Sequence, residues 1–175
     1  MNPNQNHFEL FGLPARFAVD TAALEARYLE LQREVHPDRF AAASQAEQRV
    51  STQLATRVNE AYQTLKSPLK RAGYLLQLRG VDPQFETNTS MSPEFLTEQL
   101  ELREALEQAA QSNDAHRLDP LSAQLRRERE TLLEKLGAQL DAQAAWASAA
   151  ATLRQLMFLE RFRGEIDAVQ ERMES

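Results

Sequence analysis

The chain has 175 residues, of which 42% are hydrophobic and 26% charged, and its formal net charge is −6. This composition is too apolar for a disordered protein, and the acidic balance argues against general nucleic-acid binding. There is no cysteine, which excludes a disulfide framework, a thiol nucleophile and any metal or iron–sulfur site ligated by cysteines of this chain.

Most of the chain is built from strong helix formers. Long stretches of Ala, Leu, Glu, Gln and Arg are interrupted by five glycines and seven prolines, most of them near expected element ends. This pattern predicts an almost entirely helical protein. The opening MNPNQNHFEL lacks the basic region and apolar core of a signal peptide, and no run reaches the length of a membrane span. We therefore expect a cytoplasmic protein that does not contact membranes.

The first expected elements are a short apolar turn, FELFGLP, and a helix. Asp20 or Thr21 caps this helix, which runs to about His36. Pro37 ends it, because proline disfavours helical geometry at the preceding residue. The apolar positions recur at i, i+4, i+7 and i+11, as one buried face requires; they are Leu24, Tyr28, Leu31 and Val35.

A second helix is expected from about Ala42 to Lys66. Its predicted buried face consists of Ala43, Val50, Leu54, Val58, Ala61 and Leu65. The short connection between two such faces implies an antiparallel hairpin. A third helix follows, with Ser67 as cap, Pro68 at its first position and Gly80 just past its end.

A domain boundary is expected in residues 79–93, RGVDPQFETNTSMSP, which are rich in turn and cap residues and have no helical periodicity. We predict a first domain at 1–79, a linker at 80–92 and a second domain at 93–175. The first domain has ten Lys or Arg against eight Asp or Glu, and the remainder has ten against eighteen. This asymmetry suggests two modules that face different partners.

The second domain is predicted to be a three-helix bundle. One helix spans about 93–111, the next runs from near Asp114 or Asp119 to about Leu140, and the last spans about 142–173. Short connections favour an up-down-up arrangement. Pro120 interrupts the middle pattern, so that helix is either kinked or begins there. The expected inward residues are Leu121, Leu125, Leu132, Leu136, Leu140, Trp146, Ala149, Leu153, Leu156, Leu159, Phe162, Ile166, Val169 and Met173.

The tripeptide His36-Pro37-Asp38 stands in the hairpin connection and allows several interpretations. An imidazole beside a carboxylate is typical of acid–base catalysis, but the chain has no nucleophile elbow, no Gly-rich phosphate loop and no HExxH. Its three histidines are not paired at helical spacing, which disfavours a metal site. If the tripeptide only ends the helix, each of its three residue types is explained separately. The order His-Pro-Asp in the loop of a helical hairpin is not explained. An exposed contact loop remains the alternative.

Beside this loop the first helix has an outward row at i, i+4 and i+7, namely Leu29, Arg33 and His36. Arg27 lies at its flank, and Arg39 follows the tripeptide. A basic strip with one exposed leucine favours docking of an acidic partner. The alternative is a solvated face, because glutamates are interleaved with the arginines: Glu25, Glu30 and Glu34.

The first helix of the second domain has more apolar surface than one stripe needs. Leu96 and Leu100 project away from its inward side toward Glu104 and Glu107. Apolar residues rimmed by acids suggest a partner site. The alternative, which periodicity alone favours, is a wide core face shared by two neighbouring helices. Phe158 also lies off the main stripe of the last helix. The inward side itself consists of Phe95, Leu102, Leu106 and Ala109.

Several stretches together resemble the HscB family, the J-domain co-chaperones of iron–sulfur cluster biogenesis. They are FELFGLP, HPD followed by RF, VNEAYQTLKSPLKRAGYLL and FLTEQLELREAL, and they cover nearly the whole chain. HPD alone indicates a J-domain, whereas its combination with LKSPLKRAGYLL and EQLELRE is much more specific. The resemblance implies an N-terminal J-domain joined to a C-terminal three-helix bundle.

The resemblance also implies the partners. A DnaK-class chaperone, HscA, would bind the first domain, which would stimulate its ATP hydrolysis without being an enzyme. The scaffold IscU would bind the second domain and be delivered to that chaperone. The chaperone-binding residues would be His36, Pro37, Asp38, Arg27, Leu29, Arg33 and Arg39. The scaffold-binding residues would be Leu96, Thr97, Leu100, Glu101, Glu104, Gln108 and Phe158.

This sequence departs from the family pattern at Thr97 and Met157, where a larger apolar and a basic residue are expected. The zinc-binding cysteines of some eukaryotic relatives are absent, which favours the bacterial, zinc-free form with no metal and no cofactor. A J-domain adaptor for a different client protein is the alternative function.

Overall fold

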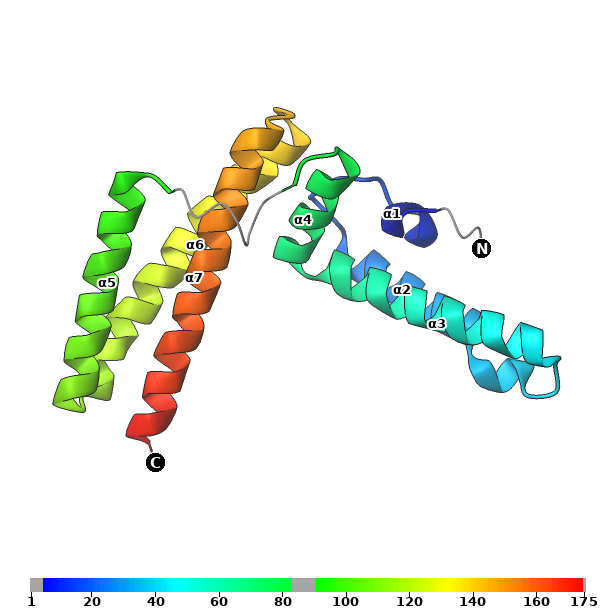
Figure 1. The fold of residues 1–175 in the computed structure, drawn as a ribbon, viewed down its shortest axis with the longest axis horizontal. Helices are drawn as coiled ribbons and strands as arrows, with labels where there is room; N and C mark the ends of the chain where they lie inside the picture. The colour runs from blue at the N-terminus through cyan, green and yellow to red at the C-terminus, as the bar shows by residue number, and fades with distance from the viewer. Residues whose placement is uncertain (1–4, 83–90, 175) are drawn as a thin grey trace. The chain divides into compact units, whose positions relative to one another are not determined.

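The structure is a computed structural model that describes residues 5–82 and 91–174 (Figure 1). Every regular element in this part of the chain is helical, so the predicted all-α class is confirmed. None of the helices in the same part combines the length and hydropathy that a bilayer-spanning segment needs. The elements are α1 (His7–Phe11), α2 (Thr21–Val35), η1 (Pro37–Phe40), α3 (Gln45–Lys66), α4 (Pro68–Leu78), α5 (Pro93–Ser112), η2 (Ala115–Arg117), α6 (Leu118–Asp141) and α7 (Trp146–Met173).

The chain divides into two compact units, Met1–Leu78 and Arg79–Ser175. The predicted linker, 80–92, lies largely outside the described residues.

The first unit is organised around the α2–α3 hairpin (Figure 1). The Asp20 side chain caps α2 by accepting hydrogen bonds from the backbone N–H groups of Ala22 and Ala23 at 2.9 and 3.0 Å. At the other end His36 leaves helical geometry, with ψ at 127°, as its position before Pro37 requires. The buried apolar residues of this unit are Phe8, Leu10, Phe11, Leu24, Leu31, Val35, Val58, Ala61, Tyr62, Leu65, Ala72, Leu75 and Leu76.

Helix α3 begins at Gln45 rather than at Ala42. The Ser44 hydroxyl oxygen accepts a hydrogen bond from the Glu47 N–H, and the Glu47 carboxylate accepts one from the Ser44 N–H at 2.9 Å. This reciprocal capping box sets the start of the helix.

The predicted buried face of α3 is wrong at its N-terminal end. Val50 is 53% exposed, and Ala43 precedes the helix and is half-buried. The reason lies in the neighbouring element: the first turns of α3 lie beside the four-residue turn η1, since α2 has already ended at Val35. A single short turn offers less apolar surface than a facing helix does.

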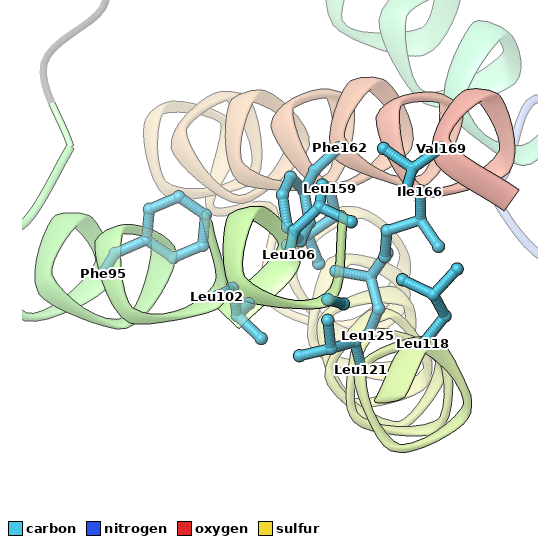
Figure 2. Close-up of a cluster of buried hydrophobic side chains, with 11 residues drawn as sticks. Phe95, Leu102, Leu106, Leu118, Leu121, Leu125, Leu159, Phe162, Ile166 and Val169 are labelled. Carbon is cyan, nitrogen blue, oxygen red and sulfur yellow. The ribbon is translucent and has the colours of Figure 1, made fainter. Parts of the chain in front are cut away.

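The second unit is the predicted three-helix bundle of α5, α6 and α7, and its fold class is confirmed. Figure 2 shows one part of its core, where apolar side chains of all three helices meet. Leu118 opens α6 and is buried, and Pro120 follows within the first helical turn. Backbone N–H groups in a first turn have no intrahelical partner, so Pro120 costs no hydrogen bond there. Helix α6 can therefore begin at Leu118, two residues before Pro120.

Candidate functional site

The residues His36, Pro37 and Asp38 occupy the joint between α2 and η1. His36 follows the last residue of α2, and Pro37 is the first residue of η1. The backbone N–H of Asp38 donates a hydrogen bond to His36 Nδ1 at 3.3 Å, and Asp38 Oδ2 lies 3.6 Å from the same nitrogen. The Asp38 side chain is 91% exposed. The loop thus holds an imidazole and a carboxylate in a fixed local arrangement that faces solvent.

This arrangement offers exposed polar groups to another molecule. Because His36 Nδ1 accepts a hydrogen bond, the neutral imidazole carries its proton on Nε2 and retains a donor for a partner. A nucleophilic mechanism needs a hydroxyl or thiol within hydrogen-bond reach of the base. Among the described residues, the His36 ring has no hydroxyl partner. Likewise, no group of three or more His, Cys, Asp or Glu in that part of the chain is placed to hold a metal ion.

The loop is braced by Arg39. Its backbone N–H donates to the His36 carbonyl at 3.1 Å, and its Nη1 donates to the Arg33 carbonyl at 3.2 Å. Ser51 on α3 adds a third tie, since its hydroxyl donates to the Val35 carbonyl at 2.8 Å. These bonds occupy carbonyls at the end of α2 that have no intrahelical partner. The loop is consequently tied to both helices of the hairpin.

One part of the outward face of α2 is a solvated face, and another part is free to dock a partner. Arg27 Nη1 lies 3.0 Å from Glu30 Oε2 and 3.7 Å from Glu34 Oε1, so Arg27 belongs to a solvated ion-pair network. Leu29 and Arg33 are exposed, and within the described residues the Arg33 side chain has no ion-pair partner. The open, positively charged part of this face is therefore the end nearest the loop.

On the second unit, Leu96 and Leu100 of α5 are 49% and 59% exposed. The inward residues of the same helix are buried and meet α6 and α7 in the core (Figure 2). The shared-core alternative is therefore wrong for these two leucines. They form an exposed apolar pair on α5. The side of this helix that faces the core is formed by other residues, namely Phe95, Leu102, Leu106 and Ala109.

The polar residues of the predicted scaffold site are also exposed. At about 100° per residue, Glu104 follows Leu96 and Leu100 around the helix, and the next positions in the same direction are Thr97, Gln108 and Glu101. The structure thus places all six on the outward side of α5. Its N-terminal end is fastened by Ser92, whose hydroxyl oxygen accepts a hydrogen bond from the Phe95 N–H at 3.2 Å.

Phe158 is half-buried and lies against α5. Its ring meets that of Phe95 edge to face, with centroids 5.8 Å apart and an interplanar angle of 78°. The guanidinium of Arg103 lies 5.4 Å from the Phe158 ring centroid, and Arg103 Nη2 lies 3.3 Å from Glu165 Oε1. Sequence reasoning missed Arg103, although Leu96, Leu100 and Arg103 follow one another at i, i+4 and i+7.

A hydrogen bond between a buried glutamine of α5 and a half-buried glutamate of α6 was also missed by sequence reasoning. Gln99 is buried in α5, and its Nε2 donates to Glu128 Oε1 on α6 at 3.4 Å. Burial raises the pKa of Glu128, the negative charge of Glu98 raises it further, and the Gln99 hydrogen bond partly offsets both. The pair places a costly charge next to the apolar core of the bundle.

Comparison with known proteins gives a consistent result. Residues 91–167 match the family model described as the HSCB C-terminal oligomerisation domain. A co-chaperone protein HscB homolog from Burkholderia multivorans is 55% identical over 170 residues, which cover 97% of each chain. The solved chaperone HscB from Vibrio cholerae is 38% identical with a TM-score of 0.84, covering 97% of this chain and 99% of that one. The human co-chaperone protein HscB is 31% identical with a TM-score of 0.88, covering 96% of this chain and 83% of that one.

Proposed function

The chain belongs to the HscB family of co-chaperones, and we propose that it brings a DnaK-class ATPase and an iron–sulfur scaffold protein together. By family resemblance these partners are HscA and IscU. Residues 1–79 act as the J-domain, 80–92 as a linker and 93–175 as the scaffold-binding domain. ATP hydrolysis takes place on the partner, in the cytoplasm, and this chain supplies contacts rather than catalytic groups.

At the J-domain end, the observation that carries the proposal is the exposed, internally braced loop of His36, Pro37 and Asp38. Arg33 and Arg39 attract an acidic surface, while the imidazole N–H and the Asp38 carboxylate offer one donor and one acceptor of fixed geometry. Binding accelerates hydrolysis only if the loop contacts the hydrolysis-competent state of the ATPase better than its resting state. A preformed loop favours this, because little conformational entropy is lost when it is bound.

At the scaffold end, Leu96, Leu100 and Phe158 supply the apolar centre of the contact. Exposed apolar side chains that become fully desolvated usually carry most of the binding energy of an interface. Glu101 and Glu104 form an acidic margin that selects a basic rim on the scaffold. Thr97 and Gln108 extend the same face with groups that form hydrogen bonds.

The two ends act together through proximity. A chaperone and a scaffold bound to one 175-residue chain are present to each other at a high effective concentration, which replaces a slow bimolecular encounter.

The test is a steady-state ATPase assay of the cognate chaperone alone, with this protein, with the scaffold, and with both. We expect this protein to stimulate hydrolysis and the scaffold to increase that stimulation further. An ATPase rate that does not respond to this protein would rule out the proposed function. Stimulation that is the same with and without the scaffold would rule out its scaffold-delivery part.

A further inference from the structure

A preformed apolar pocket lies at the loop end of the α2–α3 hairpin. Its volume is about 290 Å³, and its apolar walls include Val35 from α2, Phe40 from η1, and Val50 and Leu54 from α3. Small-molecule sites usually have volumes of roughly 300 to 1,000 Å³. This pocket lies at the lower limit of that range, and a single large apolar side chain from another protein suits it better.

The interior of the pocket offers no unsatisfied hydroxyl. Ser51 also lines it, but its hydroxyl donates to the Val35 carbonyl at 2.8 Å. Val50 is 53% exposed at the pocket, although the periodicity of α3 assigns it to the buried face. An apolar side chain entering here would cover Val50 without leaving a polar group unpaired.

The walls are held in place before any partner arrives. The Gln48 side chain donates hydrogen bonds to the carbonyls of Ala41 and Ala43 at 3.2 and 3.1 Å, which fastens the segment after η1 to α3. The Ser44–Glu47 capping box fixes the first turn of α3 beside it. Preorganisation of this kind reduces the entropic cost of binding.

The charged residues that line the pocket are both acidic. Glu34 is exposed, and its nearest cation is Arg27 Nη1 at 3.7 Å. Glu47 is exposed and accepts hydrogen bonds from the Ser44 hydroxyl and N–H, which lower its pKa and keep it ionised. An apolar pocket with two carboxylates at its margin is complementary to an apolar side chain next to a Lys or Arg.

We propose that the pocket receives an apolar side chain with a neighbouring Lys or Arg, presented by the same ATPase that the His36–Asp38 loop engages. This inference rests on the proposed function. Continuity supports it: Val35 directly precedes His36, and Phe40 directly follows Arg39. A protein in contact with the loop therefore has the pocket within reach. The J-domain then recognises acidic groups through its arginines and a basic-apolar pair through the pocket.

The first test is an ATPase titration with Val50→Asp and its matched control Thr52→Asp. Thr52 is exposed on the same helix, about 200° around from Val50. We expect Val50→Asp to raise the concentration for half-maximal stimulation about tenfold, because a charge would be desolvated in the contact. Thr52→Asp should stay within about twofold of wild type, as surface changes outside a contact usually do. Equal half-maximal concentrations for the two variants would overturn the pocket assignment.

The second test uses the absence of cysteine from the chain. Val50→Cys and Thr52→Cys are each labelled with a benzophenone maleimide and irradiated with the chaperone present. We expect cross-linking from position 50 to a chaperone segment in which an apolar residue stands within about two positions of a Lys or Arg. Cross-linking no stronger than from position 52, or to a purely acidic segment, would overturn the inference.

The ATPase assay gives different results if the proposed function is wrong and if only the pocket assignment is wrong. If wild-type protein does not stimulate the ATPase, both the proposed function and the pocket assignment are wrong. If wild type stimulates, while Val50→Asp keeps the wild-type half-maximal concentration, the function stands and the pocket assignment alone is wrong. Circular dichroism of each variant shows whether it is folded. If Val50→Asp does not fold, cross-linking from the labelled Val50→Cys protein still tests the pocket assignment.

Discussion

Truncating the two exposed leucines of α5 should separate binding from stability. In the Leu96→Ala, Leu100→Ala double variant, the bundle loses side-chain area that is largely outside its core, since these residues are 49% and 59% exposed. Leu102→Ala is the matched comparison, because the same chemical change occurs on the same helix at a residue that is 3% exposed. Leucine and alanine are both good helix formers, so helix propensity changes little in either variant.

The expected magnitudes follow from those exposures. Burying a leucine fully is worth about 1.5 to 3 kcal/mol, and the two exposed fractions together amount to about one leucine side chain. The double variant should therefore lose about 2 kcal/mol of scaffold binding, which is roughly a 30-fold increase in Kd. Leu102→Ala should instead lose about 2 to 5 kcal/mol of folding stability by leaving a cavity in the core.

Two measurements check this pair of expectations. Titration calorimetry with the scaffold gives Kd, and thermal unfolding followed by circular dichroism gives the melting midpoint, which shifts by about 4 to 8 °C per kcal/mol in a unit of this size. We expect the double variant to bind weakly and melt near the wild-type temperature, and Leu102→Ala to melt well below it. A double variant that melts as low as Leu102→Ala would show that the two leucines are core residues. Unchanged Kd would show that the scaffold binds elsewhere.

Three further predictions concern the loop, a buried cation and a half-buried acid. His36→Gln should keep the wild-type helicity and melting midpoint but abolish stimulation of the chaperone ATPase; retained stimulation would contradict the role of the loop. Arg71 is buried and donates to the carbonyls of Phe17 and Leu65, so Arg71→Met should cost roughly 2 to 4 kcal/mol in urea unfolding, and a wild-type midpoint would contradict this. Since burial raises the pKa of Glu128 in the folded state above 4.5, the ionised acid destabilises the fold increasingly as pH rises through that raised pKa. Glu128→Gln should therefore be more stable than wild type at neutral pH, and this difference should shrink as pH falls toward 4.5; a difference independent of pH would contradict the reasoning.

Much of the fold could be predicted because its signals are local. The apolar period of α2, the Asp20 cap and the effect of Pro37 on His36 all act within a few residues. The order His-Pro-Asp in a hairpin loop suggested a contact surface, whereas for Leu96 and Leu100 periodicity favoured a shared core face and the family resemblance implied the contact. Local propensity and periodicity therefore account for most of the helices, while the scaffold-site residues came from the family resemblance.

The exposure of Val50 and the burial of Arg71 depend on elements that pack against them from elsewhere in the chain. Val50 has the right spacing for the core, but η1 stands where a facing helix would have covered it. Arg71 looks like an ordinary surface cation in the sequence, and its buried position follows from carbonyls 6 and 54 residues away along the chain. The periodicity of a single helix carries no information about η1 beside Val50 or about the carbonyls that Arg71 binds.

The sequence by itself determined the main helices, the Asp20 cap, the position of His36, Pro37 and Asp38 at the end of a helix, and the family to which the chain belongs. The tertiary structure alone decided that Leu96 and Leu100 are exposed, that Arg103 lies over Phe158, and that an apolar pocket opens beside the loop. The physical reason is the separation along the chain of the groups that interact. Backbone hydrogen bonds and caps are settled within about one helical turn, whereas exposure and pocket shape depend on side chains brought together from distant positions.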